Sequence, residues 1–241
     1  GAKLYASDSS GTAVYAGPIE VDGYLNAKGY KTGVDAVSVD VQNSSSKIYA
    51  TSTCNLTADS SPNEGGAVIC EYLRNRGYIY AKSYGKHSVA IFCSDHLNSY
   101  KGSTIKAYGQ ESGSYGIYFR EDSLVQGYVL SKGYKAGVFC DDSSTLDVNG
   151  GKVYAYGVNT KGTRTGDGIQ MISDERQGDL SISGGGYVKA KGKYYGVSVS
   201  ELRLDGAKDK LYAYESASSA ASIEACAVRC DRLDNDGYVY A

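Results

Sequence analysis

The chain has little proline, phenylalanine or methionine and lacks both tryptophan and any long apolar run. Its 241 residues include no tryptophan, three phenylalanines, one methionine and two prolines. No apolar run approaches the roughly 18 residues that a transmembrane helix requires. The net charge is −2, from 25 basic and 27 acidic residues, which argues against a nucleic-acid partner. The first residues carry no signal-peptide pattern, and a start at Gly1 suggests a processed chain.

Catalytic and metal motifs are also missing. The two histidines, His87 and His96, flank one short stretch, and we interpret both as surface residues. No Ser-His-Asp set, phosphate loop or metal motif appears, and no cysteine or histidine spacing suits zinc. The sequence therefore predicts a protein that is not an enzyme. A polysaccharide lyase or glycoside hydrolase built on carboxylates remains the enzymatic alternative.

What the chain has instead is a repeat. Ten times an aliphatic residue is followed two positions later by a small residue, which is alanine in nine cases. The mean spacing is about 26 residues, and the aliphatic residues are Leu4, Leu25, Ile48, Ile79, Ile105, Val129, Val153, Val188, Leu211 and Val239. A period of 20 to 50 residues is typical of a solenoid. Because the repeat covers the whole chain, we expect a single domain over residues 1–241.

Each repeat divides into three short segments that alternate apolar and polar residues and are bounded by Gly, Asn, Asp or Ser. This pattern indicates half-buried strands. We predict an all-β fold: a right-handed parallel β-helix of about nine to ten coils, with three short strands in each. The inward pairs predicted for the second strand include Val37 with Val39 and Val68 with Cys70.

Six cysteines raise the question of disulfides. Four of them are predicted to share one inward position with Val39, Phe119, Met171 and Val199, namely Cys70, Cys93, Cys140 and Cys230. Of these, only Cys70 and Cys93 lie on neighbouring coils, so only that pair could bridge within the ladder. We expect free thiols that act as small hydrophobic side chains.

Tyrosine is strongly over-represented, at 24 residues. On the outward side of the first strand, tyrosine and lysine alternate from coil to coil. This pattern predicts a carbohydrate-binding surface, whose candidate residues are Tyr80, Tyr108, Tyr154, Tyr156, Lys152 and Tyr212. The alternative is that Lys–Tyr pairs on adjacent strands only stabilise an exposed sheet and keep it soluble. The longest coils swell between the first and second strands, at residues 55–66, 110–115, 158–167 and 215–222, so we expect these loops to line one edge of the site.

Acidic residues follow the second strand in most coils. Carboxylates from neighbouring coils would suit calcium, and the candidate ligands are Asp122, Asp141, Asp142 and Asp174. The alternative is that turns favour aspartate and that nearby arginines balance the charge.

Two segments, Leu180–Gly192 and Leu146–Ala155, carry a strand, an Asn/Ser-Gly-Gly turn and a second strand. This unit resembles that of secreted bacterial right-handed parallel β-helix proteins, and is similar to surface carbohydrate-binding β-helices with a pectate-lyase-like fold. The resemblance implies a secreted or cell-surface location, a polysaccharide or surface glycan as partner, and calcium as the only candidate cofactor. Here tyrosine and lysine replace the threonine common on such sheets.

A second function is compatible with the same repeat. The first and last coils show no capping element, which leaves sheet edges open to edge or end-to-end association. A structural stalk or adhesin segment without a small ligand is therefore the alternative to the carbohydrate-binding module.

Overall fold

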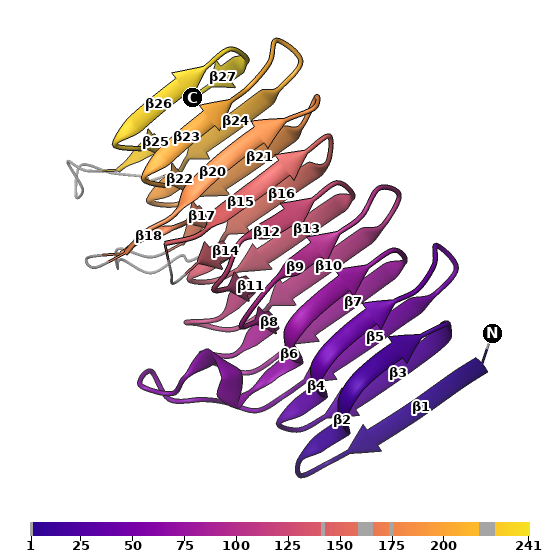
Figure 1. Ribbon diagram of the computed structural model, residues 1–241. Helices are drawn as coiled ribbons and strands as arrows, with labels where there is room; N and C mark the ends of the chain where they lie inside the picture. Colours follow the sequence, from indigo (N-terminus) through magenta and orange to yellow (C-terminus); the bar gives the residue numbers. More distant parts are fainter. Residues whose placement is uncertain (1, 141–142, 159–165, 174–175, 217–224) are drawn as a thin grey trace.

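The computed structural model describes residues 2–140, 143–158, 166–173, 176–216 and 225–241. In this part of the chain the strands stack into a parallel β-helix, as predicted (Figure 1). One strand pair is antiparallel, the two-residue strands β18 (Ile172–Ser173) and β19 (Arg176–Gln177). The one helix found in these ranges is a 3-10 turn, η1 (Pro62–Glu64). No helix among the described residues is long and apolar enough to cross a membrane.

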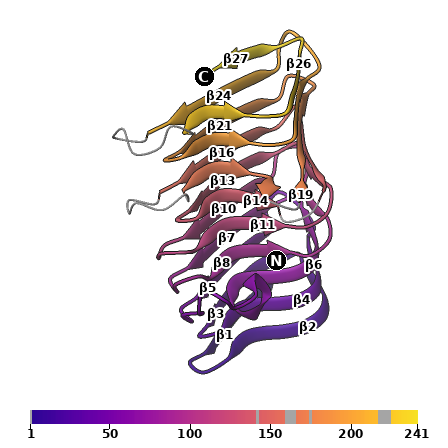
Figure 2. The ribbon, with the colours of Figure 1, turned by 90° about the vertical axis from the view of Figure 1, so that its left-hand side faces the viewer.

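The first strands of the coils form one ten-stranded parallel sheet, called sheet A here. Figure 2 shows its strands stacked along the long axis of the molecule. In spatial order they are β1 (Ala2–Asp8), β3 (Gly23–Gly29), β5 (Lys47–Ser52), β7 (Tyr78–Ser83), β10 (Thr104–Gly109), β13 (Tyr128–Gly133), β16 (Lys152–Gly157), β21 (Tyr187–Gly192), β24 (Lys210–Glu215) and β27 (Tyr238–Tyr240). Leu25 lies opposite Leu4 and Ile48, and every other repeat position is aligned in the same way. The alignment confirms the repeat read from the sequence.

The second and third strands form two further series. The second series is β8 (Val89–Cys93), β11 (Tyr115–Phe119), β14 (Ala136–Cys140), β17 (Asp167–Gln170), β22 (Tyr195–Ser198) and β25 (Cys226–Arg229). The third is β9 (Leu97–Ser99), β12 (Ser123–Val125), β15 (Thr145–Asn149), β20 (Asp179–Ser183), β23 (Glu201–Leu204) and β26 (Arg232–Asn235). Near the N-terminus one ten-residue strand covers both positions, as in β2 (Thr12–Val21), β4 (Thr32–Val41) and β6 (Gly66–Asn75). Three separate strands per coil therefore appear only from β7 onward.

One predicted inward pair is wrong. Val37 is 47% exposed, whereas Val34 and Val39 are fully buried. The long strand β4 turns a corner between Ala36 and Val39, and the alternation of inward and outward residues is interrupted there. As a result Cys70 lies opposite Ala36, and the expected partner Val39 lies opposite Leu73.

The rest of the cysteine ladder follows the prediction. Cys93 lies opposite Cys70 on one side and Phe119 on the other, and Phe119 lies opposite Cys140. All six cysteines are free thiols in the structure. The Cys93 thiol donates to the Glu71 carbonyl at 3.0 Å. A hydrogen bond with Cys93 and burial both raise the pKa of the Cys70 thiol. Cys70, Cys93 and Cys140 act as core side chains, whereas Cys54, Cys226 and Cys230 are only partly buried.

The interior is narrow because sheet A meets the second series at a sharp corner. A Cβ added to Gly137 would lie 2.5 Å from the Tyr156 nitrogen and 2.8 Å from the Gly168 oxygen. The equivalent position is glycine or alanine throughout the described coils, at Gly33, Ala67, Ala90, Gly116, Gly137, Gly168, Gly196 and Ala227. Close packing at this corner leaves no room for large side chains on the facing strands. It explains why alanine follows the aliphatic residue in sheet A.

Enlarging one of these alanines should destabilise the fold. Ala107 is fully buried, and we expect Ala107→Leu to lower the free energy of unfolding by about 1–3 kcal/mol through overpacking. Urea unfolding followed by circular dichroism measures the change. The control is Lys106→Leu on the outward side of the same strand, where the neighbouring coil already has Leu130. Equal stability of the two variants would contradict a narrow core.

Candidate functional site

The outward side of sheet A carries three columns of aligned residues, which we call the Tyr/Lys face. The first column is Lys3, Tyr24, Lys47, Tyr78, Thr104, Tyr128, Lys152, Tyr187, Lys210 and Tyr238. The second is Tyr5, Asn26, Tyr49, Tyr80, Lys106, Leu130, Tyr154, Lys189, Tyr212 and Tyr240. The third is Ser7, Lys28, Thr51, Lys82, Tyr108, Lys132, Tyr156, Lys191 and Tyr214. Tyrosine and lysine residues that alternate along the sequence repeat therefore lie next to each other on neighbouring strands.

The charge of this face differs from that of the whole chain. Its 29 positions hold 14 tyrosines, 10 lysines and no aspartate or glutamate. The other 15 basic residues and all 27 acidic residues lie elsewhere in the chain. The face is therefore strongly cationic although the net charge is only −2. The net charge alone hides this asymmetry.

The tyrosine rings of the face pack against one another across the strands. Neighbouring rings have centroids 5.3 to 6.0 Å apart and are tilted by 32 to 51°. Ring contacts of this kind stabilise a sheet beyond the area they bury. Most of these tyrosines are accordingly half-buried on the surface of the sheet.

Lysines sit over the edges of this aromatic layer. The Lys132 ammonium lies 5.5 Å from the Tyr156 ring centre and 6.0 Å from that of Tyr108. The Lys189 ammonium lies 5.6 Å from the Tyr214 ring centre. Exposed contacts at this distance are worth about 0.5–1 kcal/mol each. These contacts stabilise the sheet and keep the lysine ammonium groups close to the tyrosine rings.

The six predicted binding residues fall into two groups on the face. Tyr80 and Tyr108 belong to the run of rings nearer the N-terminus, with centroids 5.5 Å apart. Tyr154 and Tyr212 belong to the other run, in which both contact Tyr187. Lys152 and Tyr156 lie on the same strand as Tyr154, on its outward side. The run of ring contacts is interrupted between Tyr108 and Tyr128, but Lys132 on β13 lies over both Tyr108 and Tyr156 and bridges the two groups.

Three of the four predicted calcium ligands lie outside the residues that the structure describes. Asp141, Asp142 and Asp174 lie outside the described residues. The Asp122 carboxylate accepts the Thr145 backbone N–H at 2.7 Å, which links two coils. Among the described residues no group of three or more His, Cys, Asp or Glu side chains could hold a metal ion. Calcium binding stays a prediction.

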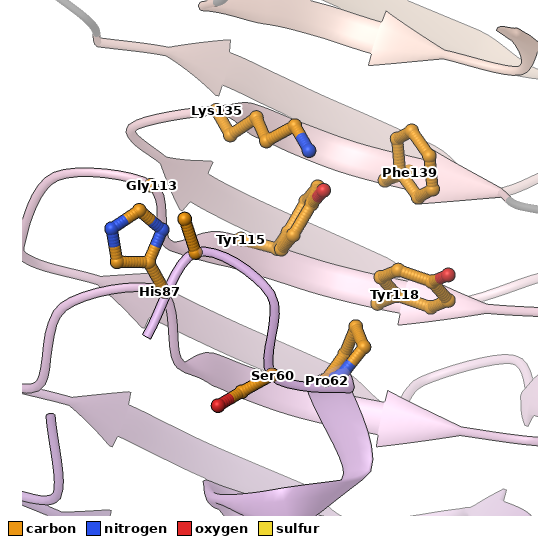
Figure 3. Close-up of a pocket in the computed structure, with 9 residues that line it drawn as sticks. Ser60, Pro62, His87, Gly113, Tyr115, Tyr118, Lys135 and Phe139 are labelled. Atoms are coloured by element: carbon orange, nitrogen blue, oxygen red, sulfur yellow. The ribbon is translucent and has the colours of Figure 1, made fainter. Parts of the chain in front are cut away.

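Sequence reasoning missed a cavity at the edge where the longest loops lie. It has a volume of about 250 Å³ and is lined by Ala58, Ser60, Pro62, His87, Gly113, Tyr115, Tyr118, Lys135 and Phe139 (Figure 3). Two of the predicted edge loops, residues 55–66 and 110–115, contribute to its wall. The signal in the sequence was the aromatic residues at outward positions of the second series, Phe92, Tyr118 and Phe139, which align across three coils.

Among the described carboxyl groups, Asp167 has the largest pKa shift, and it lies opposite Ala136 in the second series. Asp167 is 2% exposed, and burial raises its pKa from 3.8 to about 7. The Tyr195 N–H, which donates to its Oδ1 at 3.0 Å, and the charge of Arg229 oppose that rise. Between these two pKa values the folded protein binds more protons than the unfolded chain, so stability falls as the pH rises.

Replacement of this carboxyl group should remove that pH dependence. Asp167→Asn keeps an oxygen for the Tyr195 N–H and cannot ionise. We expect the variant to gain stability relative to the wild type as the pH rises from about 4 to about 7, and to keep that gain above it. Urea unfolding at pH 4.5, 6 and 8 measures this difference. A difference that is the same at all three pH values would contradict the assignment.

Comparison with known proteins adds no relative. No family model, no curated protein and no solved structure matches the chain. The structure supports the parallel β-helix part of the resemblance noted in the sequence. The function rests on the residues of the molecule itself.

Proposed function

We propose that the protein is a non-catalytic carbohydrate-binding or adhesion module that holds an acidic polysaccharide along the Tyr/Lys face. One observation carries the proposal: ten lysines, fourteen tyrosines and no carboxylate share the outward side of a single sheet. Lysine attracts the carboxylate or sulfate groups of such a polymer. Tyrosine hydroxyls and ring edges supply hydrogen bonds and apolar contact to the sugars between them.

The spacing of the face favours a long ligand. Adjacent parallel strands lie about 4.8 Å apart, so lysines in alternate coils of one column repeat at about 9.6 Å. This repeat is comparable to the length of a disaccharide unit. Each exposed ion pair contributes only about 0.2–1 kcal/mol, so useful affinity requires many contacts made at once. A polymer makes them and a single sugar does not.

We further propose the cellular location that such a module needs. A secreted or cell-surface location in a bacterium would expose the face to extracellular glycans. Calcium is the cofactor to test, because the acidic residues after the second strand remain its candidate ligands.

Removing lysines from the face should weaken binding to acidic polymers. We expect the triple variant Lys152→Gln, Lys189→Gln, Lys210→Gln to bind about 3- to 150-fold more weakly, since three exposed ion pairs are lost. Affinity electrophoresis in gels containing polygalacturonate or hyaluronan, with a neutral β-glucan gel alongside, measures it with calcium and with chelator.

The matched control removes the same three charges from exposed turns outside sheet A, as Lys31→Gln, Lys101→Gln, Lys208→Gln. Its migration without polymer should equal that of the first variant, and its retardation should equal that of the wild type. Equal losses in both variants, or no retardation by any acidic polymer, would refute the proposed site.

A structural stalk or adhesin segment is the second candidate function. Leu4 in β1 and Leu233 in β26 are 56% and 53% exposed at the two ends of the stack. Strands β1 and β27 each pair on one side only. Open strand edges of this kind favour association. Sedimentation velocity over a hundredfold concentration range should then show growing species, whereas a constant monomer would count against the stalk.

A further inference from the structure

One region of the outer surface is buried although its side chains point away from the core. The outward column of β8, β11 and β14 holds Phe92, Tyr118 and Phe139, which are at most 7% exposed. They form a second hydrophobic cluster with Ile69, Val89, Tyr115 and Ala136. Tyr115 and Tyr118 meet edge to face at 5.3 Å, and Phe139 lies 5.0 Å and 4.9 Å from them. Loops therefore build an extra layer over these coils.

The cavity opens between this aromatic cluster and the loop that precedes η1. Figure 3 shows Tyr115, Tyr118 and Phe139 forming one wall, with Ser60 and Pro62 across from them. The Lys135 ammonium lies 5.1 Å from the Tyr115 ring centre. None of the described lining residues is acidic. The described wall thus combines aromatic rings, two of them carrying the hydroxyl groups of Tyr115 and Tyr118, with the Lys135 ammonium and the side chains of Ser60 and His87.

His87 is held in this wall in an unfavourable backbone conformation. It has a φ of 55°, the only positive φ among the described residues other than glycine. Its N–H donates to the Ser112 carbonyl at 2.9 Å. The next loop passes so close that a Cβ on Gly113, which has a φ of 76°, would collide with the imidazole. Backbone strain of this kind gathers at binding sites, where the surrounding structure maintains it.

We propose that this cavity is a binding site for a small ligand made of one ring and one carboxylate group. The ring would pack on the aromatic cluster, and the carboxylate would pair with Lys135 and accept a hydrogen bond from His87 or Ser60. The volume of about 250 Å³ lies just below the range of about 300–1,000 Å³ for pockets that take drug-sized molecules, so it suits a single ring. The site is separate from the Tyr/Lys face and does not depend on polymer binding there.

Four probes separate the ring from the charge. They are D-glucuronate and benzoate, which carry both features, D-glucose, which lacks the charge, and acetate, which lacks the ring. Isothermal titration calorimetry with the intact chain should show saturable binding of glucuronate, benzoate or both, and much weaker binding of glucose and acetate. Whether the sugar acid or the aromatic acid binds more tightly identifies the source of the ligand. Binding of neither, or acetate binding as tightly as both, would overturn the proposal.

Two variants test the residues. Lys135→Gln removes the cation, and His87→Asn removes the imidazole while retaining a residue that tolerates positive φ. We expect each to weaken binding of the better acid about tenfold or more, and Lys101→Gln, in an exposed turn, to leave it unchanged. Melting curves confirm that the variants fold. Folded variants with wild-type affinity would overturn the proposal.

The polymer assay distinguishes this site from the Tyr/Lys face. Lys135→Gln and His87→Asn should keep the retardation by acidic polysaccharide that the wild type shows. If the wild type shows none, the cavity variants still report on the small acid alone. A parallel loss of both activities in a folded variant would overturn the assignment of a separate site.

Discussion

The structure depends on the in-register stacking of parallel strands. Each inner strand of sheet A hydrogen-bonds to the strand of the coil above and to that of the coil below, so that equivalent residues lie side by side, as Ile105 does with Ile79 and Val129. The narrow corner enforces this register, because only glycine or alanine fits where sheet A meets the second series. The same kind of side chain at the equivalent position of successive coils thus forms a continuous column along the molecule. The hydrophobic core, the cysteine ladder and the Tyr/Lys face are all such columns.

Much of this arrangement could be predicted from the sequence because the alternation along the first strand is uninterrupted. Leu4 and Ala6 point inward in the same way as Leu211 and Ala213, and the outward columns follow at once. The prediction was wrong at Val37, where a strand that turns a corner breaks the alternation. Period-two reasoning describes a straight strand and has no means of locating such a bend.

The candidate sites were less predictable, for two physical reasons. Net charge sums over all faces, so it could not reveal that the outward columns of sheet A hold ten lysines and no carboxylate. Alternation alone assigns outward positions to solvent, so it places Phe92 and Tyr118 there although both are buried. The cavity depends on how a loop folds back over distant coils, and the conformation of His87 is a product of that packing. Such contacts are tertiary, and no local pattern encodes them.

The alternation of tyrosine and lysine also constrains how this molecule can change in length. The packing of the core allows insertion or deletion of one coil at a time, because the inward residues of all coils are similar. The chemistry of the first column repeats every two coils, as Tyr128, Lys152, Tyr187 and Lys210 show. Duplication or loss of a single coil would preserve the core but place like residues next to each other. Two coils together are therefore the smallest insertion or deletion that leaves both the packing and the alternation of the first column intact.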